Sequence, residues 1–443
     1  MVRGKQKKQK RLSRVLAWLG AVAILISIVV NNTTLGKITN RNLSELTYIS
    51  STILLFRIIC LVFGLLLVSN RLYLEWLIRR RKEVVLFLAV SILCIAVLEC
   101  SIPVIDKLAS KREMTYTNLE FEVAAKLNSD LFRDSEFVKK KDPETMRIIM
   151  LEDSFVYGVA VNKTQSFEYL LEYALDRHIC EGDDCRFRSA EIYNIGQSGT
   201  GLREYLDNYK RFKDYQHDAV IMVIYVDNDI NNYDADKEKY IKLFEFFDSM
   251  MLKNIRGKIS KFFSHEAPNC DRYKAELDID EKYYEACTKS LINIWLFEKF
   301  SAFAKEDYND YYDLIADQFA NKIASRTNIM KTAEIARSEG VPFFVFLVPS
   351  RYQVSDFGFE ELGKIGFHAS DEVTRNRKVQ DEILSFCKEA GLTCFDLLPD
   401  MKNVDGSMYP LIDDHLNVYG NLKVAELMFK DLSSDEQFRG LLE

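Results

Sequence analysis

A serine and a histidine in this 443-residue sequence each stand beside carboxylates, a pattern suited to nucleophilic catalysis. Ser154 directly follows an aspartate, and His415, one of only five histidines, directly follows Asp413 and Asp414. A serine hydroxyl is a weak nucleophile until a base takes its proton, and neutral imidazole does this when a carboxylate fixes its tautomer. Ser154, His415 and one of the two aspartates could therefore form a triad for acyl-ester chemistry.

Two further positions could stabilise the negative oxygen of a tetrahedral intermediate. Gly199 lies in the run 194–201, whose three glycines let backbone N–H groups approach a ligand closely. Asn228 follows the apolar run 219–226 almost directly. The backbone N–H groups of Ser154 and Gly199 and the side-chain amide of Asn228 are the expected oxyanion donors. Each residue alone is explained equally well as a cap or turn residue, so the prediction depends on their joint arrangement.

The elements that must position these residues form an α/β pattern from about residue 145 onward. Nearly continuous apolar runs of strand length alternate with amphipathic stretches, which predicts a three-layer α/β/α fold around a central parallel sheet. Ligands of such sheets bind beyond the carboxyl ends of the strands, where all the candidate residues lie. Expected strands span 147–151, 190–195, 219–226, 342–348 and 393–397, and expected helices span 166–178, 201–213, 313–338, 371–390 and 418–431.

Taken together, these blocks resemble the SGNH, or GDSL, hydrolase family over residues 145–435, with a flavodoxin-like sheet. The resemblance rests on the DSFxxG pattern at 153–158, a glycine after Asn194, the Asn228–Asp229 pair, and Asp413-x-His415-x-Asn417 followed by Gly420. It implies Ser154 as nucleophile, His415 as base, and Gly199 and Asn228 as oxyanion donors. The Asp-x-His spacing is similar to that of periplasmic acetyltransferases, which selects Asp413 as the acid and keeps Asp414 as second choice. Glu152 stands where the family usually has glycine.

The resemblance implies an enzyme acting on ester bonds outside the cytoplasm. The first hypothesis is a serine esterase that removes an acyl group, acetyl above all, from an envelope or extracellular glycan through an acyl-enzyme on Ser154. The second is an O-acyltransferase that passes the acyl group to a glycan hydroxyl, with a membrane partner supplying it. The third is an inactive domain that binds glycan or acts as a scaffold, for which Glu152 is the main support. The triad requires neither a cofactor nor a metal ion.

Residues 1–110 have the composition of a membrane anchor with three predicted transmembrane helices at 15–36, 46–70 and 84–105. Residues 15–36 carry no charge and are long enough to cross a hydrocarbon core of about 30 Å. A cleaved signal peptide is the alternative, but no small-residue cleavage pattern occurs near Asn31. Basic residues concentrate in the N-terminal tail and in the loop 70–83, which places both in the cytoplasm. The sequence therefore predicts a multi-pass protein of the cytoplasmic membrane with its catalytic domain periplasmic or extracellular.

The remaining sequence is divided into a linker at 111–144 and the hydrolase-like domain at 145–443. A charged, aromatic-rich helical insertion at about 230–312 could roof the site or form a solvated excursion. A net charge of -7, without a basic run interleaved with aromatic residues, argues against a nucleic-acid partner. Six of the nine cysteines fall outside the predicted spans, and their local spacing favours disulfides over buried free thiols. They fall into three sequence-local pairs, Cys180 and Cys185, Cys270 and Cys287, and Cys387 and Cys394, but six cysteines allow fifteen connectivities and the sequence does not choose among them.

Overall fold

The computed structural model describes residues 2–29, 113–180, 185–230, 270–302, 307–321, 323–404 and 406–442, together with single residues between 57 and 97. The chain divides into one unit of residues 1–109 with 241–267, and a second of residues 110–240 with 268–443. Each unit is described by itself.

The described part of the first unit is the helix α1 (Val2–Val29) and single residues between 57 and 97. A Cβ atom on Gly20 would lie 2.6 Å from the backbone oxygen of Gly64, so the two backbones meet closely. The Arg57 Nε group donates to the Ser27 carbonyl at 2.9 Å. Among the described residues, no helix has both the length and the apolar character that a membrane crossing requires. Most of the predicted spans at 46–70 and 84–105 lie outside the described residues.

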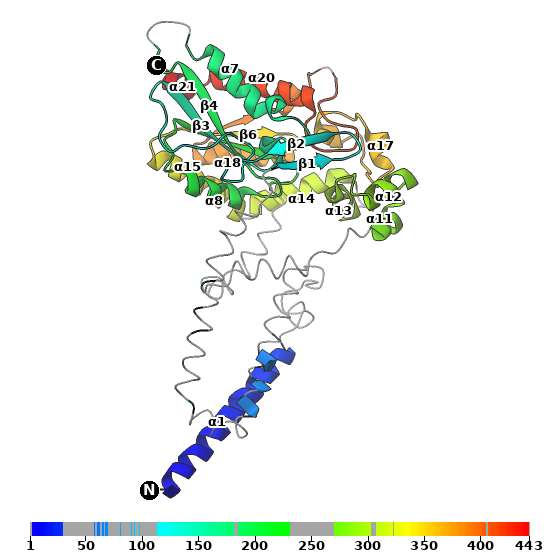
Figure 1. The fold of residues 1–443 in the computed structure, drawn as a ribbon. Coiled ribbons are helices and arrows are strands. Elements are labelled where there is room, and N and C mark those ends of the chain that lie inside the picture. The colour runs from blue at the N-terminus through cyan, green and yellow to red at the C-terminus, as the bar shows by residue number, and fades with distance from the viewer. Residues whose placement is uncertain are drawn as a thin grey trace. The chain divides into compact units, whose positions relative to one another are not determined.

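The second unit is built on a five-stranded parallel sheet, which confirms the predicted α/β class (Figure 1). The strand order is β4-β3-β5-β6-β7, so the chain moves to one side of β3 first and then to the other. This reversal makes the carboxyl ends of β3 and β5 a topological switch point, where open α/β sheets bind ligands. The strands are β3 (Thr145–Glu152), β4 (Ser189–Gly196), β5 (Ala219–Tyr225), β6 (Phe343–Val348) and β7 (Thr393–Asp396).

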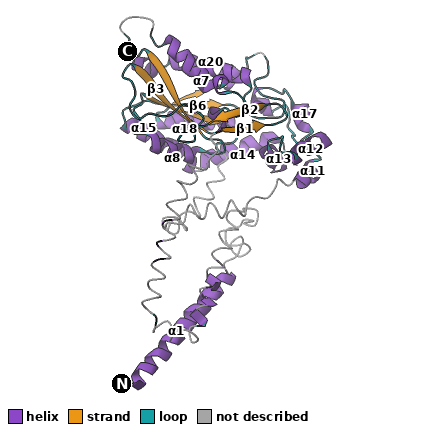
Figure 2. Cartoon of the chain, in the orientation of Figure 1, coloured by secondary structure: helices purple, strands orange, loops and turns teal. Residues whose placement is uncertain are grey.

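Helices cover both faces of the sheet (Figures 1 and 2). One apolar core lies between the sheet and α7 (Phe167–His178), α20 (Val418–Ser434) and α21 (Glu436–Leu442). The other lies beneath α8 (Leu202–Phe212), α14 (Tyr308–Asn321), α15 (Ile323–Ser338) and α18 (Lys378–Ala390). Every residue of β5 and β6 is buried, because a strand covered on both faces must be apolar throughout.

The stretch expected as a helix at 313–338 is helical in α14 and α15, and residue 322 between them lies outside the described residues. One helix prediction differs from the structure at its start. The helix expected at 371–390 begins only at Lys378, after the 3-10 turn Val373–Arg375. The side chain of Asn376 accepts from the Lys378 N–H at 3.0 Å and so satisfies a free donor at the start of the helix.

An antiparallel hairpin lies within the segment predicted as a linker. It consists of β1 (Glu113–Thr117) and β2 (Glu122–Lys126). The Asn118 side chain accepts from the N–H groups of Glu120 and Phe121, which stabilises the turn between the strands. Ala125 packs with Leu127, Tyr157 and Val159 in a small apolar cluster, so the hairpin contacts the segment that follows Ser154.

The described part of the insertion comprises α11 (Cys270–Leu277), α12 (Glu281–Thr288) and α13 (Ile294–Ala302). Leu296, Phe297 and Phe300 of α13 are buried in the same core as α14 and α18. These helices are therefore part of the packed domain and not a solvated excursion. Residues 231–269 lie outside the described residues.

Three disulfides are present, as the cysteine pattern predicts, and they join the sequence-local pairs Cys180–Cys185, Cys270–Cys287 and Cys387–Cys394. Disulfides persist in oxidising compartments and are rare in the cytoplasm. They indicate that this domain lies outside the cytoplasm.

Candidate active site

Ser154 begins a one-turn helix directly after the strand β3. This helix, α6 (Ser154–Tyr157), is capped by Asp153, whose side chain accepts from the Ser154 N–H. Gly158 ends the turn with φ = 73°, a left-handed conformation that favours glycine. The segment 152–158, called the serine turn below, thus leaves the sheet abruptly at its carboxyl edge.

The end of β4 fixes the position of the serine turn. A Cβ atom on Gly196 would lie 2.6 Å from the backbone nitrogen of Tyr157, so only glycine permits this approach. The Asn194 side chain donates to the Val156 carbonyl at 2.6 Å and accepts from the Gly196 N–H at 3.0 Å. The glycine-rich run found in the sequence therefore acts partly as packing for α6.

The structure brings Ser154, His415 and Asp413 into one hydrogen-bonded chain. His415 Nε2 lies 2.9 Å from Ser154 Oγ, and His415 Nδ1 lies 2.6 Å from Asp413 Oδ1. Asp413 Oδ1 also accepts from the His415 backbone N–H at 2.9 Å. Phe155 packs beside the imidazole, with ring centroids 5.4 Å apart. This is the geometry in which a histidine can take a serine proton while a carboxylate holds its other nitrogen.

Residues 411–417, the histidine loop, are held from three sides. Asn417 caps α20 by accepting from the Gly420 N–H at 2.8 Å. Arg351, in the short helix α16 (Arg351–Val354), donates to the Asp413 carbonyl at 2.9 Å. From the hairpin, Asn118 donates to Asp413 Oδ2 at 3.2 Å, and the Glu120 carboxylate accepts from the N–H of Ile412 at 2.8 Å.

The pKa values of His415 and Asp413 shift in opposite directions. Burial acts to lower the pKa of His415, but the charge and hydrogen bond of Asp413 outweigh it and raise that pKa above its usual value. Burial acts to raise the pKa of Asp413, but His415 and then Arg351 hold it below its usual value. Asp413 thus stays ionised and stabilises an imidazolium.

Asp414, the second choice for the triad acid, faces a different partner. Its carboxylate accepts from Lys299 Nζ at 2.7 Å and from the Tyr352 hydroxyl at 2.8 Å. Lys299 also pairs with Asp227, and all three charged groups are buried. Lys299 belongs to α13, so the insertion is tied to the histidine loop and to the segment after β5. Sequence reasoning missed Lys299, because nothing in the pattern distinguishes it from an exposed lysine.

The predicted oxyanion donors are placed unequally. Asn228 lies beside the serine turn, where its Nδ2 donates to Asp153 Oδ2 at 3.3 Å. Gly199 lies on an exposed stretch three residues beyond the end of β4, with φ = 78° and open space beside its Cα. The Ser154 N–H donates to Asp153. The other two donors lie outside the serine turn, and of these the Asn228 amide is the one that a side-chain contact places beside it.

Glu152, the departure from the family pattern, is buried behind Ser154. Its Oε2 accepts from the Val156 N–H at 2.7 Å. Its carboxyl lies with those of Asp153 and Asp229 in a group whose facing oxygens are within 4.8 Å of one another. Burial, followed by the charges of Asp153 and Asp229, raises the pKa of Glu152 well above its usual range.

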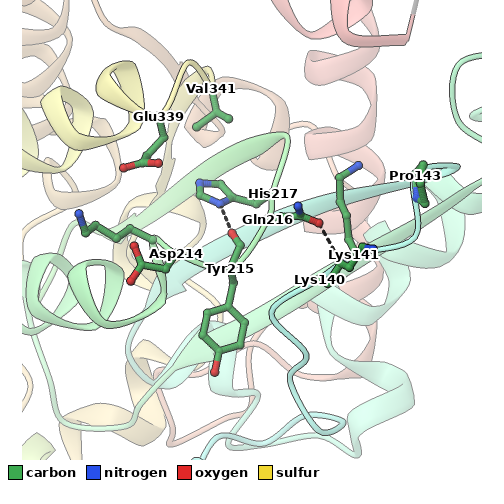
Figure 3. Close-up of a pocket in the computed structure, with 10 residues that line it drawn as sticks. Lys140, Lys141, Pro143, Asp214, Tyr215, Gln216, His217, Glu339 and Val341 are labelled. Carbon is green, nitrogen blue, oxygen red and sulfur yellow. Dashed lines mark hydrogen bonds between the residues drawn. The ribbon is translucent and has the colours of Figure 1, made fainter.

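A hollow of about 510 Å³ lies at the opposite edge of the sheet (Figure 3). Its lining precedes β3, β5 and β6, so it opens at the amino ends of the strands and not at Ser154. His217 in its wall contacts the Tyr215 carbonyl and the Tyr209 hydroxyl. No hydrogen bond links this histidine to a serine or cysteine of the described residues. The lining residues are Lys140, Lys141, Pro143, Lys213, Asp214, Tyr215, Gln216, His217, Glu339 and Val341.

No family model and no curated protein matches the sequence. Among solved structures, TesA matches with 12% identity and a TM-score of 0.31 over 65% of this chain and 98% of its own. A protein from Slackia heliotrinireducens that is described as a putative SGNH hydrolase matches with 11% identity and a TM-score of 0.30 over 65% of this chain and 98% of its own. A mutant of the esterase AlinE4 matches with 12% identity and a TM-score of 0.26 over 66% of this chain and 97% of its own. The structural neighbours are thus SGNH hydrolases and esterases at low sequence identity.

Proposed function

We propose that this protein is an extracytoplasmic serine esterase of the SGNH type, acting through an acyl-enzyme on Ser154. The observation that carries the proposal is the unbroken chain from Ser154 Oγ to His415 Nε2 at 2.9 Å and from His415 Nδ1 to Asp413 at 2.6 Å. Ser154 and the sequence-distant pair Asp413 and His415 supply the donors and acceptors of a catalytic triad, and they meet at the switch point of the sheet.

In the proposed reaction, Ser154 Oγ attacks the ester carbonyl while His415 Nε2 takes its proton. Asp413 stabilises the resulting imidazolium, which then gives the proton to the departing alcohol as the acyl-enzyme forms. Water attacks the acyl-enzyme with His415 again as base, and Ser154 recovers its proton as the acid leaves.

The hydrogen-bond donors for the developing oxyanion are less preorganised than the triad. Asn228 uses one amide hydrogen on Asp153, and its second is available for the oxyanion. The Ser154 N–H is the second proposed donor and exchanges its bond to Asp153 for one to the oxyanion, and the Gly199 N–H is the third. A Cβ atom built on Gly199 would meet no atom of the described residues within 4 Å, so the space beside this residue is open. Loss of one such donor typically lowers the rate by about a hundredfold or more.

The proposed substrate is an acyl ester, acetyl above all, of an envelope or extracellular glycan. Support comes from the disulfides, which place the domain outside the cytoplasm, and from the membrane anchor predicted for residues 1–110. The proposed location is the cytoplasmic membrane, with the N-terminus inside and the domain outside.

An O-acyltransferase is the second candidate, and three apolar stretches favour it, because a simple tether needs one span. In that case the acyl group on Ser154 passes to a glycan hydroxyl in place of water, and a membrane partner supplies it. The purified chain, given acyl donor and oligosaccharide, separates the two candidates: free acid alone excludes the transferase, and acylated oligosaccharide excludes a pure esterase.

A fluorophosphonate probe tests whether Ser154 is activated at all. The full-length protein should be labelled, whereas Ser154→Ala and His415→Ala should not. His217→Ala, which changes a buried histidine at the opposite sheet edge, is the matched control and should keep its label. Absence of labelling in the wild type would reject the enzyme and favour an inactive glycan-binding or scaffold domain.

A further inference from the structure

Three carboxyl groups lie buried together directly behind Ser154. Glu152, Asp153 and Asp229 are 0%, 2% and 1% exposed, and their facing oxygens lie within 4.8 Å of one another. Glu152 ends β3, Asp153 caps α6, and Asp229 follows β5. No ion pair of the described residues includes any of the three. We call this group the carboxyl cluster.

Three adjacent carboxylates cannot all remain ionised in such a place. Burial disfavours each charge, and the like charges repel one another with little solvent screening. Without a cation, the cluster must therefore hold at least one proton. The question is which oxygen carries it.

The hydrogen-bond donors around the cluster answer this question. Asp153 accepts three hydrogen bonds, from the N–H and the hydroxyl of Ser154 and from the Asn228 amide. Most of the hydrogen-bond donors around the cluster therefore face Asp153. Glu152 accepts only one, from Val156, and its Oε1 has no donor among the described residues.

Asp229 stands between these two cases. It accepts from the Tyr225 N–H at 2.8 Å, and its Oδ1, like Glu152 Oε1, has no donor at hydrogen-bond distance among the described residues. The Tyr205 hydroxyl of α8, itself buried, acts to lower the pKa of Asp229 against burial and the Asp153 charge. Glu152 has no second group of this kind beside it. Glu152 is therefore the member whose charged form is stabilised least.

We propose that Glu152 is a neutral carboxylic acid at physiological pH, whose Oε1–H donates to the adjacent Asp153 carboxylate and positions the serine turn. Glu152 then holds the serine turn at two points, because its Oε2 accepts from Val156 of α6 while its Oε1–H reaches Asp153. The catalytic role of this positioning rests on the proposed esterase function, whereas the protonation of Glu152 does not.

The groups facing Glu152 agree with this assignment. Burial raises its pKa first, and Asp153 of the serine turn and Asp229 beyond β5 raise it further, against the Val156 N–H. Tyr205 of α8 is buried and neutral beside the same cluster. The basic group that faces Asp153 is His415 of the histidine loop, which is cationic only when protonated.

This proton has a consequence for the serine. Ser154 Oγ lies 3.1 Å from Asp153 Oδ1 and 2.9 Å from His415 Nε2, so two acceptors compete for its hydrogen. An Asp153 that already accepts from Glu152 is the weaker acceptor. Glu152 is thus a positioning residue that leaves His415 as the base.

Infrared difference spectroscopy of the full-length protein tests the proton directly. The wild-type-minus-Glu152→Gln difference spectrum should show the carbonyl stretch of a protonated carboxylic acid at neutral pH, and the contribution of buried Glu168, whose pKa is also raised, cancels in that difference. Asp229→Asn is the matched control and should keep the band, because burial is the first cause of the Glu152 shift. A difference spectrum without this band, or a band that survives in Glu152→Gln and vanishes in Asp229→Asn, would overturn the proposal.

Thermal unfolding against pH provides a readout that needs no activity. A glutamate with a raised folded pKa loses stability as pH rises above its unfolded value of about 4.3, whereas glutamine does not titrate. The Tm of Glu152→Gln minus that of the wild type should therefore grow between about pH 5 and pH 8. A constant difference contradicts the proposal. The proposal is also contradicted if EDTA lowers the Tm of the wild type, Ca²⁺ or Mg²⁺ restores it, and Glu152→Gln shows neither effect, since the cluster would then hold a cation.

Esterase activity tests the positioning role, because the conservative variant Glu152→Gln should retain it. Glutamine can accept from Val156 and donate to the cluster as the neutral acid does. Glu152→Gln should keep kcat/KM within about threefold of the wild type, and Glu152→Ala should lose at least about tenfold. If the wild type shows no esterase activity but keeps the infrared band, the proposed function fails while the protonation stands.

Discussion

Lys299 of the insertion donates at 2.7 Å to Asp414, the residue immediately before His415 in the chain. The neighbouring Asp413 faces His415 instead, at 2.6 Å. Two successive aspartates in one loop thus have separate partners, one the imidazole and the other a buried lysine. The difference assigns them different roles and makes those roles testable one at a time.

Asp413→Asn should lower kcat by about a hundredfold to ten-thousandfold, because the imidazole loses the carboxylate that fixes its tautomer. Asp414→Asn should lower it by less than about tenfold, since His415 keeps Asp413. Steady-state hydrolysis of a nitrophenyl ester measures both variants in parallel. Equal losses in the two variants would mean that Asp413 is not the specific partner of the base.

The pH dependence of kcat/KM should show a limb on the acidic side. The base must be neutral, and the charge of Asp413 raises the pKa of His415, so activity should rise with pH through a value above about 6.5. Asp413→Asn removes that charge, so the residual activity should rise at a lower pH. A limb that stays in place in Asp413→Asn would show that it belongs to another group.

Lys299→Met should destabilise the domain by about 3–5 kcal/mol, because Asp227 and Asp414 would be left buried without a cation. Lys274→Met is the matched control. It removes a lysine of α11 that pairs at the surface with Glu281 of α12, and it should leave the free energy of unfolding unchanged. Denaturant unfolding of the two variants measures the difference. If both unfold like the wild type, the buried lysine does not tie the insertion to the histidine loop.

Asn118→Asp separates the structural part of the hairpin turn from its contact with the triad. Aspartate can still accept from the Glu120 and Phe121 N–H groups, but it cannot donate to Asp413 Oδ2, 3.2 Å away. Repulsion between the two carboxylates should lower kcat/KM by about tenfold with little change in Tm. Asn118→Ala loses both contacts and should reduce activity and Tm together.

The sequence was informative where burial controls the pattern. Strands covered on both faces are continuously apolar, so β3, β5 and β6 could be predicted, and the residues just beyond them were expected at one sheet edge. Ser154 and His415 followed from that rule and from the motif. The hairpin could not be predicted, because β1 and β2 are short and half exposed, and Asn118 is remote in sequence from the loop it contacts.

Other features depend on long-range packing that no local pattern records. Lys299 is buried only because Asp227 and Asp414 arrive from elsewhere in the chain. The start of α18 at Lys378 depends on Asn376, whose amide also reaches Asn309 at 2.7 Å. Glu152 departs from the family pattern in the sequence itself, but Asp229 comes close to it only in the folded sheet.

The three disulfides join cysteines only 5, 17 and 7 positions apart in sequence. Closing such short loops costs little chain entropy, so each bridge can form from its own segment alone. A chain exported in an extended state could thus oxidise each pair as it emerges, N-terminal pair first, before the parallel sheet has assembled. Maturation of this domain would then depend on the order of export and not on disulfide reshuffling after folding.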